Sequence, residues 1–312
     1  MDTHEGGGRA ALLACAPESA AVVEQLEAVV WRVLDVDLVD VTAQVCASVH
    51  GTAPLVRPAD LGPSPWAGRD PAEWRAFGDL STQQRVALGF AEQFTIDVAA
   101  IGDDDRASLR GAIGDDAVVY AQVVYVADVV SRLRTVLDLL FGSSEVVPAT
   151  AAVAADATVW GAIEELIRVV PGLQRLDPVV TELVRLRGAR QHNCRICQSL
   201  RSHSAFVAGA DDDMFAAVDD YPTSDLSAAQ KAALAFTDAF IWTPARLTGE
   251  VLEGLRAHYD AAQQVELVLD IARNATNKFA VSMDADGTHV TKGYEVYDVA
   301  ADGSITYGLS RP

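Results

Sequence analysis

The stretch of sequence from Asp177 to Cys197 reads DPVVTELVRLRGARQHNCRIC. Asp177 followed by Pro178 is typical of a helix start, because aspartate caps a helix and proline is tolerated at its first position. The apolar residues that follow recur close to helical spacing, at Val180, Leu183, Val184 and Leu186. The stretch therefore predicts a helix over residues 178–190, with two cysteines just beyond its end.

Cys194 and Cys197 are separated by two residues, a spacing at which two thiols can close into a disulfide. His192 and Asn193 interrupt the helical pattern, so we expect Asn193 to cap a second helix over 194–209, with Cys194 as its first residue. A helix N-terminus favours a thiolate, because its exposed N–H groups carry partial positive charge. The pair is therefore predicted to be reactive.

Three further side chains are candidates for the same site. Arg201 lies seven residues after Cys194 and four after Cys197, which places all three on one face of the predicted helix. Its guanidinium would stabilise a thiolate or an anionic ligand. His192 precedes the pair and could reach back to it, and Glu182 could move protons when a disulfide forms. The residues alone thus point to Cys194 and Cys197 as a redox pair, with His192 and Arg201 in supporting roles. A glutamate at helical spacing such as Glu182 is ordinarily exposed to solvent, and a catalytic role for it depends on the wider pattern described below.

The composition limits the possible partners. The chain has 312 residues, 50% of them hydrophobic, and a formal net charge of −20. Nucleic acids and anionic membranes require a basic face, so neither is an expected partner. The sequence has no run of about eighteen apolar residues, and Asp2 and Glu5 precede Arg9 where a secretion signal would have a basic start. We expect a cytoplasmic protein.

The cysteine content favours redox chemistry over a metal site. Four cysteines are too few for a disulfide framework, and in a reducing compartment a close pair indicates redox chemistry or metal binding. Structural zinc requires four ligands, whereas this segment offers one cysteine pair and His192 or His203. We therefore predict no metal and no cofactor.

The two halves of the chain resemble each other. Leu80–Arg85 (LSTQQR) and Leu226–Lys231 (LSAAQK) align, and the same offset in numbering pairs Leu88 with Leu234, Phe90 with Phe236, Phe94 with Phe240, Leu109 with Leu255 and Arg110 with Arg256. Two unrelated amphipathic helices would not keep one register over this length. We interpret the chain as an internal duplication.

The duplication suggests three parts. Residues 1–150 form a helical repeat that lacks the cysteine pair; its corresponding stretch, Asp37–His50, has only Cys46, which we expect to be a small buried residue. Residues 151–285 form the repeat that carries the Glu-x11-Cys-x2-Cys pattern. Residues 286–312 form a C-terminal tail, in which Tyr294–Val299 and Ser304–Tyr307 alternate at period two around Asp302-Gly303; this predicts a β-hairpin. The expected fold is all-α, with two tandem repeats and a short C-terminal hairpin.

The pattern Glu182-x11-Cys194-x2-Cys197 resembles that of the alkylhydroperoxidase D-like group in the carboxymuconolactone decarboxylase superfamily. Further segments follow the order of that superfamily, in which tandem copies also occur: Glu182–Arg187, Ala208–Asp211, Leu226–Phe240, Gln264–Leu267 and Asn274-x3-Lys278. The resemblance covers residues 156–285 well and 20–141 loosely. It implies helical repeats that assemble into homo-oligomers.

The resemblance also implies an activity, that of a peroxidase-like dithiol/disulfide oxidoreductase of the alkylhydroperoxidase or peroxiredoxin type, with an antioxidant role. Cys197 would attack a peroxide, Cys194 would resolve the intermediate and Glu182 would relay protons, while a thiol or disulfide electron donor would reduce the pair. The redox group usually has histidine where this chain has Arg201. The alternative is a non-redox lyase or decarboxylase of the same superfamily, in which Arg201 holds the carboxylate of a small-molecule substrate.

Overall fold

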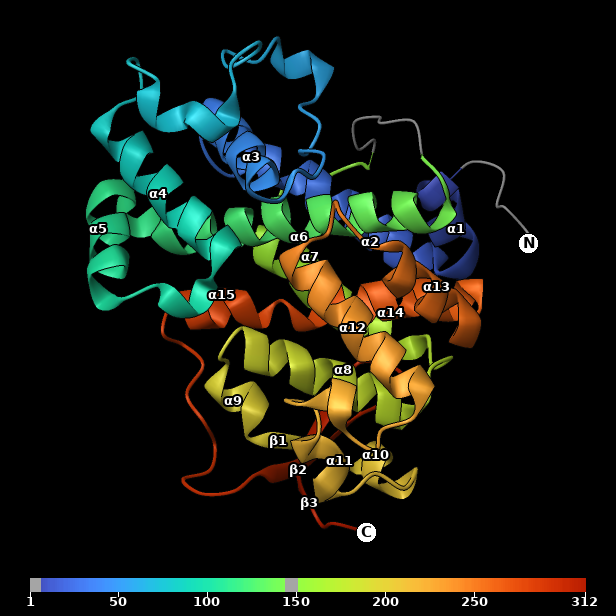
Figure 1. Ribbon diagram of the computed structural model, residues 1–312. Coiled ribbons are helices and arrows are strands. Elements are labelled where there is room, and N and C mark those ends of the chain that lie inside the picture. Colours follow the sequence, from blue (N-terminus) through green and yellow to red (C-terminus); the bar gives the residue numbers. More distant parts are fainter. Residues whose placement is uncertain (1–6, 144–150) are drawn as a thin grey trace.

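The computed structural model describes residues 7–143 and 151–312, and the described chain is mostly helical, with a small mixed sheet near its C-terminus (Figure 1). The helices before residue 143 are α1 (Gly7–Cys15), α2 (Pro17–Val29), α3 (Val36–His50), α4 (Thr82–Ile96), α5 (Asp103–Ile113) and α6 (Ala117–Phe141). Those after residue 151 are α7 (Val159–Val169), α8 (Pro178–Gln191), α9 (Arg195–Gln198), α10 (His203–Val207), α11 (Asp212–Ala216), α12 (Ala228–Trp242), α13 (Gly249–His258), α14 (Ala261–Asn274) and α15 (Asn277–Ser282). Short 3-10 turns join several of them. In the described residues, no helix is both long and apolar enough to cross a membrane.

The segments aligned by the internal repeat form similar helices. α4 and α12 have 15 residues each, and both begin with a capping box, Ser81 with Gln84 and Ser227 with Gln230. In such a box the serine side chain accepts the N–H of the third helical residue, whose glutamine side chain accepts the serine N–H in return. α5 and α13 come next in each half. The order of helices is thus compatible with a duplication, which remains an interpretation.

The buried core is shared by the two halves. One hydrophobic cluster includes Phe94 of α4, Tyr125 of α6, Phe240 of α12 and Leu269 of α14. The Tyr125 hydroxyl also donates a hydrogen bond to the carbonyl of Ala272 at 3.0 Å. Figure 1 shows α6 in the middle of the molecule, between the helices of the first half and those of the second.

The proposed division into residues 1–150, 151–285 and 286–312 remains a prediction. The connection that we expect between the halves, residues 142–156, includes 144–150, which lie outside the described residues.

The predicted C-terminal hairpin is confirmed, and it belongs to a larger sheet. β2 (Glu295–Val299) pairs antiparallel with β3 (Ile305–Leu309). β2 also pairs in parallel with β1 (Leu200–Ser202), so that Arg201 lies opposite Val296. The hairpin therefore extends into a three-stranded sheet, ordered β1-β2-β3, against the segment that follows the cysteines.

The predicted single helix over 194–209 is wrong. Asn193 adopts a left-handed φ of 52°, Cys194 is the N-cap, and α9 ends after one turn at Gln198. The chain then enters β1, because the backbone of residues 200–202 pairs with β2. Hydrogen bonds to a strand about a hundred positions away thus replace the helical bonds that the local sequence favours.

Candidate active site

The cysteine pair lies in the turn between α8 and β1. Cys194 and Cys197 form a disulfide, with their Cα atoms 5.3 Å apart. Cys194 is fully buried, whereas Cys197 is partly exposed. The N–H of Cys197 donates a hydrogen bond to the Cys194 sulfur at 3.2 Å. Cys197 is therefore the more accessible thiol after reduction, and Cys194 already has a donor that would stabilise its thiolate.

A polar chain leads from Cys197 into the protein. Asn277, in the first turn of α15, donates from its side-chain amide to the Cys197 sulfur at 3.5 Å. Its carbonyl oxygen lies 3.0 Å from Nδ1 of His192. Burial and the positive charge of Lys278 lower the pKa of His192 to about 3, so its imidazole is neutral near pH 7. His192 thus reaches Cys197 through Asn277, a residue that the sequence analysis did not identify.

The cysteine turn is fixed to the segment after α15. The buried carboxylate of Asp286 accepts the backbone N–H of Arg195 at 2.7 Å, and its carbonyl accepts that of Ile196 at 3.0 Å. The Arg195 side chain also forms ion pairs with Asp284 and Asp286. These contacts fix the turn through its backbone N–H groups and through the Arg195 side chain.

Glu182 is buried beside the turn, and its carboxylate is fully engaged. Both of its oxygens lie 2.7 Å from nitrogens of Arg185, and it also accepts the N–H of Ser202 and the hydroxyl of Tyr297, at 3.1 and 3.3 Å. Arg185 in turn donates to the carbonyl of Cys197 at 2.7 Å. Glu182 is therefore connected to the cysteine turn through Arg185, and none of the described contacts of its carboxylate is with a sulfur.

Arg201 does not share a helix face with the two cysteines, so the spacing argument for its role was wrong. It lies in β1, where its guanidinium donates to the carbonyls of Gln198 and Leu200 at 2.8 and 2.6 Å. The same group stacks on Phe215 and Tyr294, 5.5 and 5.1 Å from the ring centroids. In the part of the chain that the structure describes, these contacts bind Arg201 to the sheet and not to a thiol.

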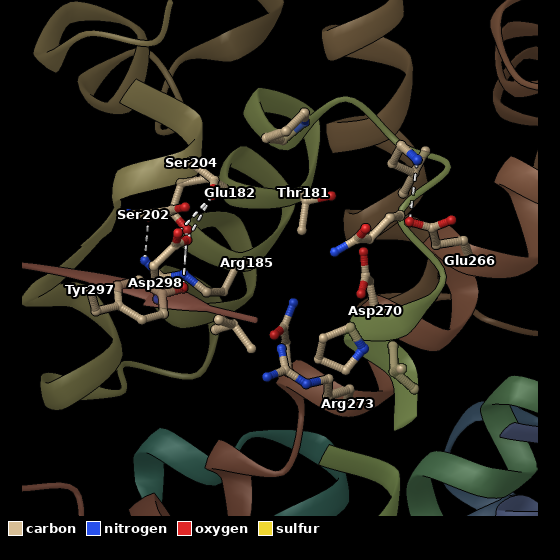
Figure 2. A pocket seen from close by; sticks show the side chains of 17 residues that line it. Thr181, Glu182, Arg185, Ser202, Ser204, Glu266, Asp270, Arg273, Tyr297 and Asp298 are labelled. Atoms are coloured by element: carbon tan, nitrogen blue, oxygen red, sulfur yellow. Dashed lines mark hydrogen bonds and ion pairs between the residues drawn. The ribbon is translucent and has the colours of Figure 1, made fainter. Parts of the chain in front are cut away.

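A cavity of about 410 Å³ adjoins the Glu182–Arg185 pair. Residues of α8, α14, β1 and β2 line it, and neither cysteine is among them. Figure 2 shows Glu182 and Arg185 on one side of this space, with Asp270 and Arg273 of α14 facing them. The sequence did not identify either residue of α14, because a charged residue on a mixed polar and apolar helix is no local signal of a site.

The first half has no comparable dithiol. Cys46 is buried, as predicted, and burial raises the pKa of its thiol to about 12. Cys15 is the other free cysteine. Among the described residues, no group of three or more histidine, cysteine, aspartate or glutamate side chains is placed to hold a metal ion.

No protein-family model matches the sequence. The chain is 40% identical over 233 residues to two proteins of Mycobacterium tuberculosis, Rv2313c of strain H37Rv and MT2376 of strain CDC 1551, both described as uncharacterized. The similar region covers 73% of this chain and 82% of each relative. At that identity and coverage, the chain belongs to the same protein family as these uncharacterized mycobacterial proteins.

Proposed function

We propose that the protein is a peroxidase-like dithiol/disulfide oxidoreductase in which Cys194 and Cys197 are the redox pair. The observation that carries this proposal is the disulfide between a buried and a partly exposed cysteine, with Asn277 and His192 in a hydrogen-bonded chain behind the exposed one. The resemblance to the alkylhydroperoxidase D-like group supports the same activity.

The reaction begins with reduced cysteines. The Cys197 thiolate attacks the terminal oxygen of an organic hydroperoxide; the S–O bond forms, the O–O bond breaks and the alkoxide leaves as an alcohol after taking a proton. The sulfur of Cys194 then attacks the sulfenic acid on Cys197, which releases water and forms the disulfide. A dithiol donor reduces that disulfide by thiol–disulfide exchange, so two electrons pass from the donor to the peroxide.

Different residues would relay protons and stabilise the thiolate. Glu182 is the relay that the resemblance implies, and its link to the cysteine turn runs through Arg185. The chain from Cys197 through Asn277 to His192 has another role, because His192 Nδ1 donates to the Asn277 oxygen and the Asn277 amide donates to the sulfur. Both hydrogen bonds point toward Cys197, so this chain stabilises its thiolate and does not accept its proton.

The fold and setting proposed with this function follow the resemblance. We infer that the chain is a tandem pair of alkylhydroperoxidase D-like repeats, of which only the second carries the dithiol. The equivalent capping boxes of α4 and α12 support the duplication. We further infer a cytoplasmic homo-oligomer that is reduced by a thiol or disulfide donor.

The test is the intact mass of fully reduced protein before and after one equivalent of cumene hydroperoxide, followed by peptide mapping. We expect the loss of two hydrogen atoms, mapped to Cys194 and Cys197. Cys197→Ser should abolish this loss and the turnover of peroxide with dithiothreitol. Cys15→Ser, which changes a free cysteine outside the pair, is the matched control and should behave like the wild type.

Two results would count against the proposal. An unchanged mass, or slow oxidation scattered over Cys15 and Cys46, would show ordinary thiols. An activity on a carboxylate substrate that persists when both Cys194 and Cys197 are replaced would favour the lyase or decarboxylase instead.

A further inference from the structure

The cavity beside Glu182 has the size of a small-molecule site. Its volume of about 410 Å³ lies within the roughly 300–1,000 Å³ typical of ligand pockets. Glu182, the proposed proton relay, lies in its wall, but neither cysteine lines it, so the redox steps proposed above make no use of the rest of the cavity.

Most charged groups around the cavity already have partners. Glu182 pairs with Arg185. Glu266 accepts the backbone N–H groups of Arg175 and Leu176, at 2.7 and 3.2 Å. Asp298 accepts the Ser204 hydroxyl, 2.8 and 2.9 Å from its two oxygens. These groups line the cavity, but their hydrogen bonds are already made within the protein, so few remain for a ligand.

Asp270 is different, because it is buried without a hydrogen-bond partner. Its residue is only 5% exposed, it lines the cavity, and no described residue donates a hydrogen bond to its carboxylate. Burial raises its pKa to about 7, with the charge of Arg273 acting in the opposite direction. Its carboxylate lines the cavity, so a ligand there could supply the hydrogen bonds that the described residues do not.

Arg273 supplies the opposite charge to the same space. It lies three residues after Asp270 on α14 and lines the cavity with it, and Figure 2 shows both side chains reaching into the space. Its Nε donates to the carbonyl of Ile167 at 3.1 Å, and among the described residues its charge acts on Asp270 without a hydrogen bond between the two side chains. The hydroxyl of Thr181 and the amide of Asn274 line the same cavity.

We propose that this cavity binds a small zwitterion of the α-amino acid type, with its ammonium group on Asp270 and its carboxylate on Arg273. A simple amine would satisfy Asp270 and leave the guanidinium facing the ligand, and a simple carboxylate would do the reverse. A zwitterion satisfies both, and Arg273 can hold a carboxylate with two parallel hydrogen bonds. Thr181 and Asn274 provide further polar contacts for the same ligand.

The site has a direct contact with the redox turn. Arg185 borders the cavity and also donates to the carbonyl of Cys197. The binding site is nevertheless separate from the thiols, so it can be tested in the oxidised protein whether or not the dithiol reduces peroxides.

The probes are the twenty proteinogenic L-amino acids, each added to oxidised wild-type protein in a thermal-shift screen, with isothermal titration calorimetry on those that raise Tm. We expect at least one to bind. The corresponding amine without the carboxyl group, and the corresponding acid without the amino group, should each bind at least tenfold more weakly. Asp270→Asn and Arg273→Gln should each weaken binding by a similar factor.

The controls are Asp225→Asn and Arg246→Gln, which make the same chemical changes at exposed positions outside the cavity and should bind as the wild type does. The wild-type screen decides the question even if a cavity variant fails to fold. The proposal is overturned if no amino acid binds, or if the amine binds as tightly as the amino acid and Arg273→Gln has no effect, which would indicate a site for cations.

Discussion

Asn277 contacts the sulfur of the partly exposed cysteine, since its amide donates to the Cys197 sulfur and its oxygen accepts from His192. We expect Asn277→Ala to slow the oxidation of reduced Cys197 by about tenfold. A hydrogen bond to a charged group contributes roughly 1.5–3 kcal/mol, and a factor of ten corresponds to about 1.4 kcal/mol. Stopped-flow measurement of thiol loss with cumene hydroperoxide gives the rate.

Arg201→Ala is the informative comparison for that measurement. Its guanidinium holds carbonyls and stacks on Phe215 and Tyr294, so its loss should lower Tm and leave the oxidation rate within about twofold of the wild type. If Arg201→Ala slowed oxidation as much as Asn277→Ala does, Arg201 would support the reactivity of the cysteine pair even though it does not share a helix face with it.

The sequence could identify residues within the motif but not those brought to it by packing. His192 was predicted from its position just before the cysteines, and the structure connects it to Cys197. Asn277 comes from a helix 80 residues further along the chain, with no local pattern to mark it. Glu182 looks like a surface glutamate by helical spacing, yet it is buried, and the Tyr297 hydroxyl of β2 and the Ser202 N–H of β1 reach its carboxylate.

At the level of elements, local signals predicted the helices better than the sheet. Capping residues and apolar spacing are properties of neighbouring positions, so α8 begins at Pro178 as expected and ends one residue beyond the expected position. β1 has only three residues, and what makes it a strand is its pairing with β2. A three-residue segment cannot show this from its own composition, which explains why a helix was predicted across it.

Because β2 and β3 lie near the C-terminus, removing them should destabilise β1 and the contacts of Glu182. A chain that ends at Gly293 lacks β2 and β3, and with them the bond from the Glu295 N–H to the Ser199 carbonyl and the Tyr297 hydroxyl on Glu182. We expect its Tm to fall by more than about 5 °C, a loss of a few kcal/mol. Hydrogen exchange of residues 199–202 should become much faster.

A chain that ends at Leu309 keeps all three strands and is the matched control. Unchanged exchange at residues 199–202 in the shorter chain would show that β1 is held by α8 and α10 alone, contrary to this view of the sheet.

At the level of the whole molecule, a buried ion cluster joins the two halves. Asp128 and Arg132 of α6 form an ion pair of 2.6 Å, and Lys278 of α15 lies 2.5 Å from the other oxygen of Asp128. Arg132 also donates to the carbonyls of Phe240 and Thr95, at 3.3 and 3.1 Å. The cluster, together with the shared hydrophobic core, indicates that two repeats in sequence need not be two folding units.

The cluster also has a defined dependence on pH. Burial opposes the ionisation of Asp128, but Arg132 and Lys278 outweigh it and lower its pKa to about 2. Its contribution to stability is therefore fully present above about pH 4, the usual range for aspartate, and is lost as the pH falls toward 2.

Asp128→Asn should therefore be strongly destabilising at neutral pH, because it leaves two buried cations without their counter-charge. Breaking a buried pair in this way costs about 3–5 kcal/mol. Lys278→Met should cost less, since Asp128 keeps Arg132 as its partner. Thermal unfolding at pH 7 and at pH 3 measures both effects, and the difference in stability between Asp128→Asn and the wild type should be smaller at pH 3.

Because the cluster contacts both halves, the wild type and both variants should unfold in a single transition. Two transitions, with only one shifted by Asp128→Asn, would show instead that the repeats fold independently.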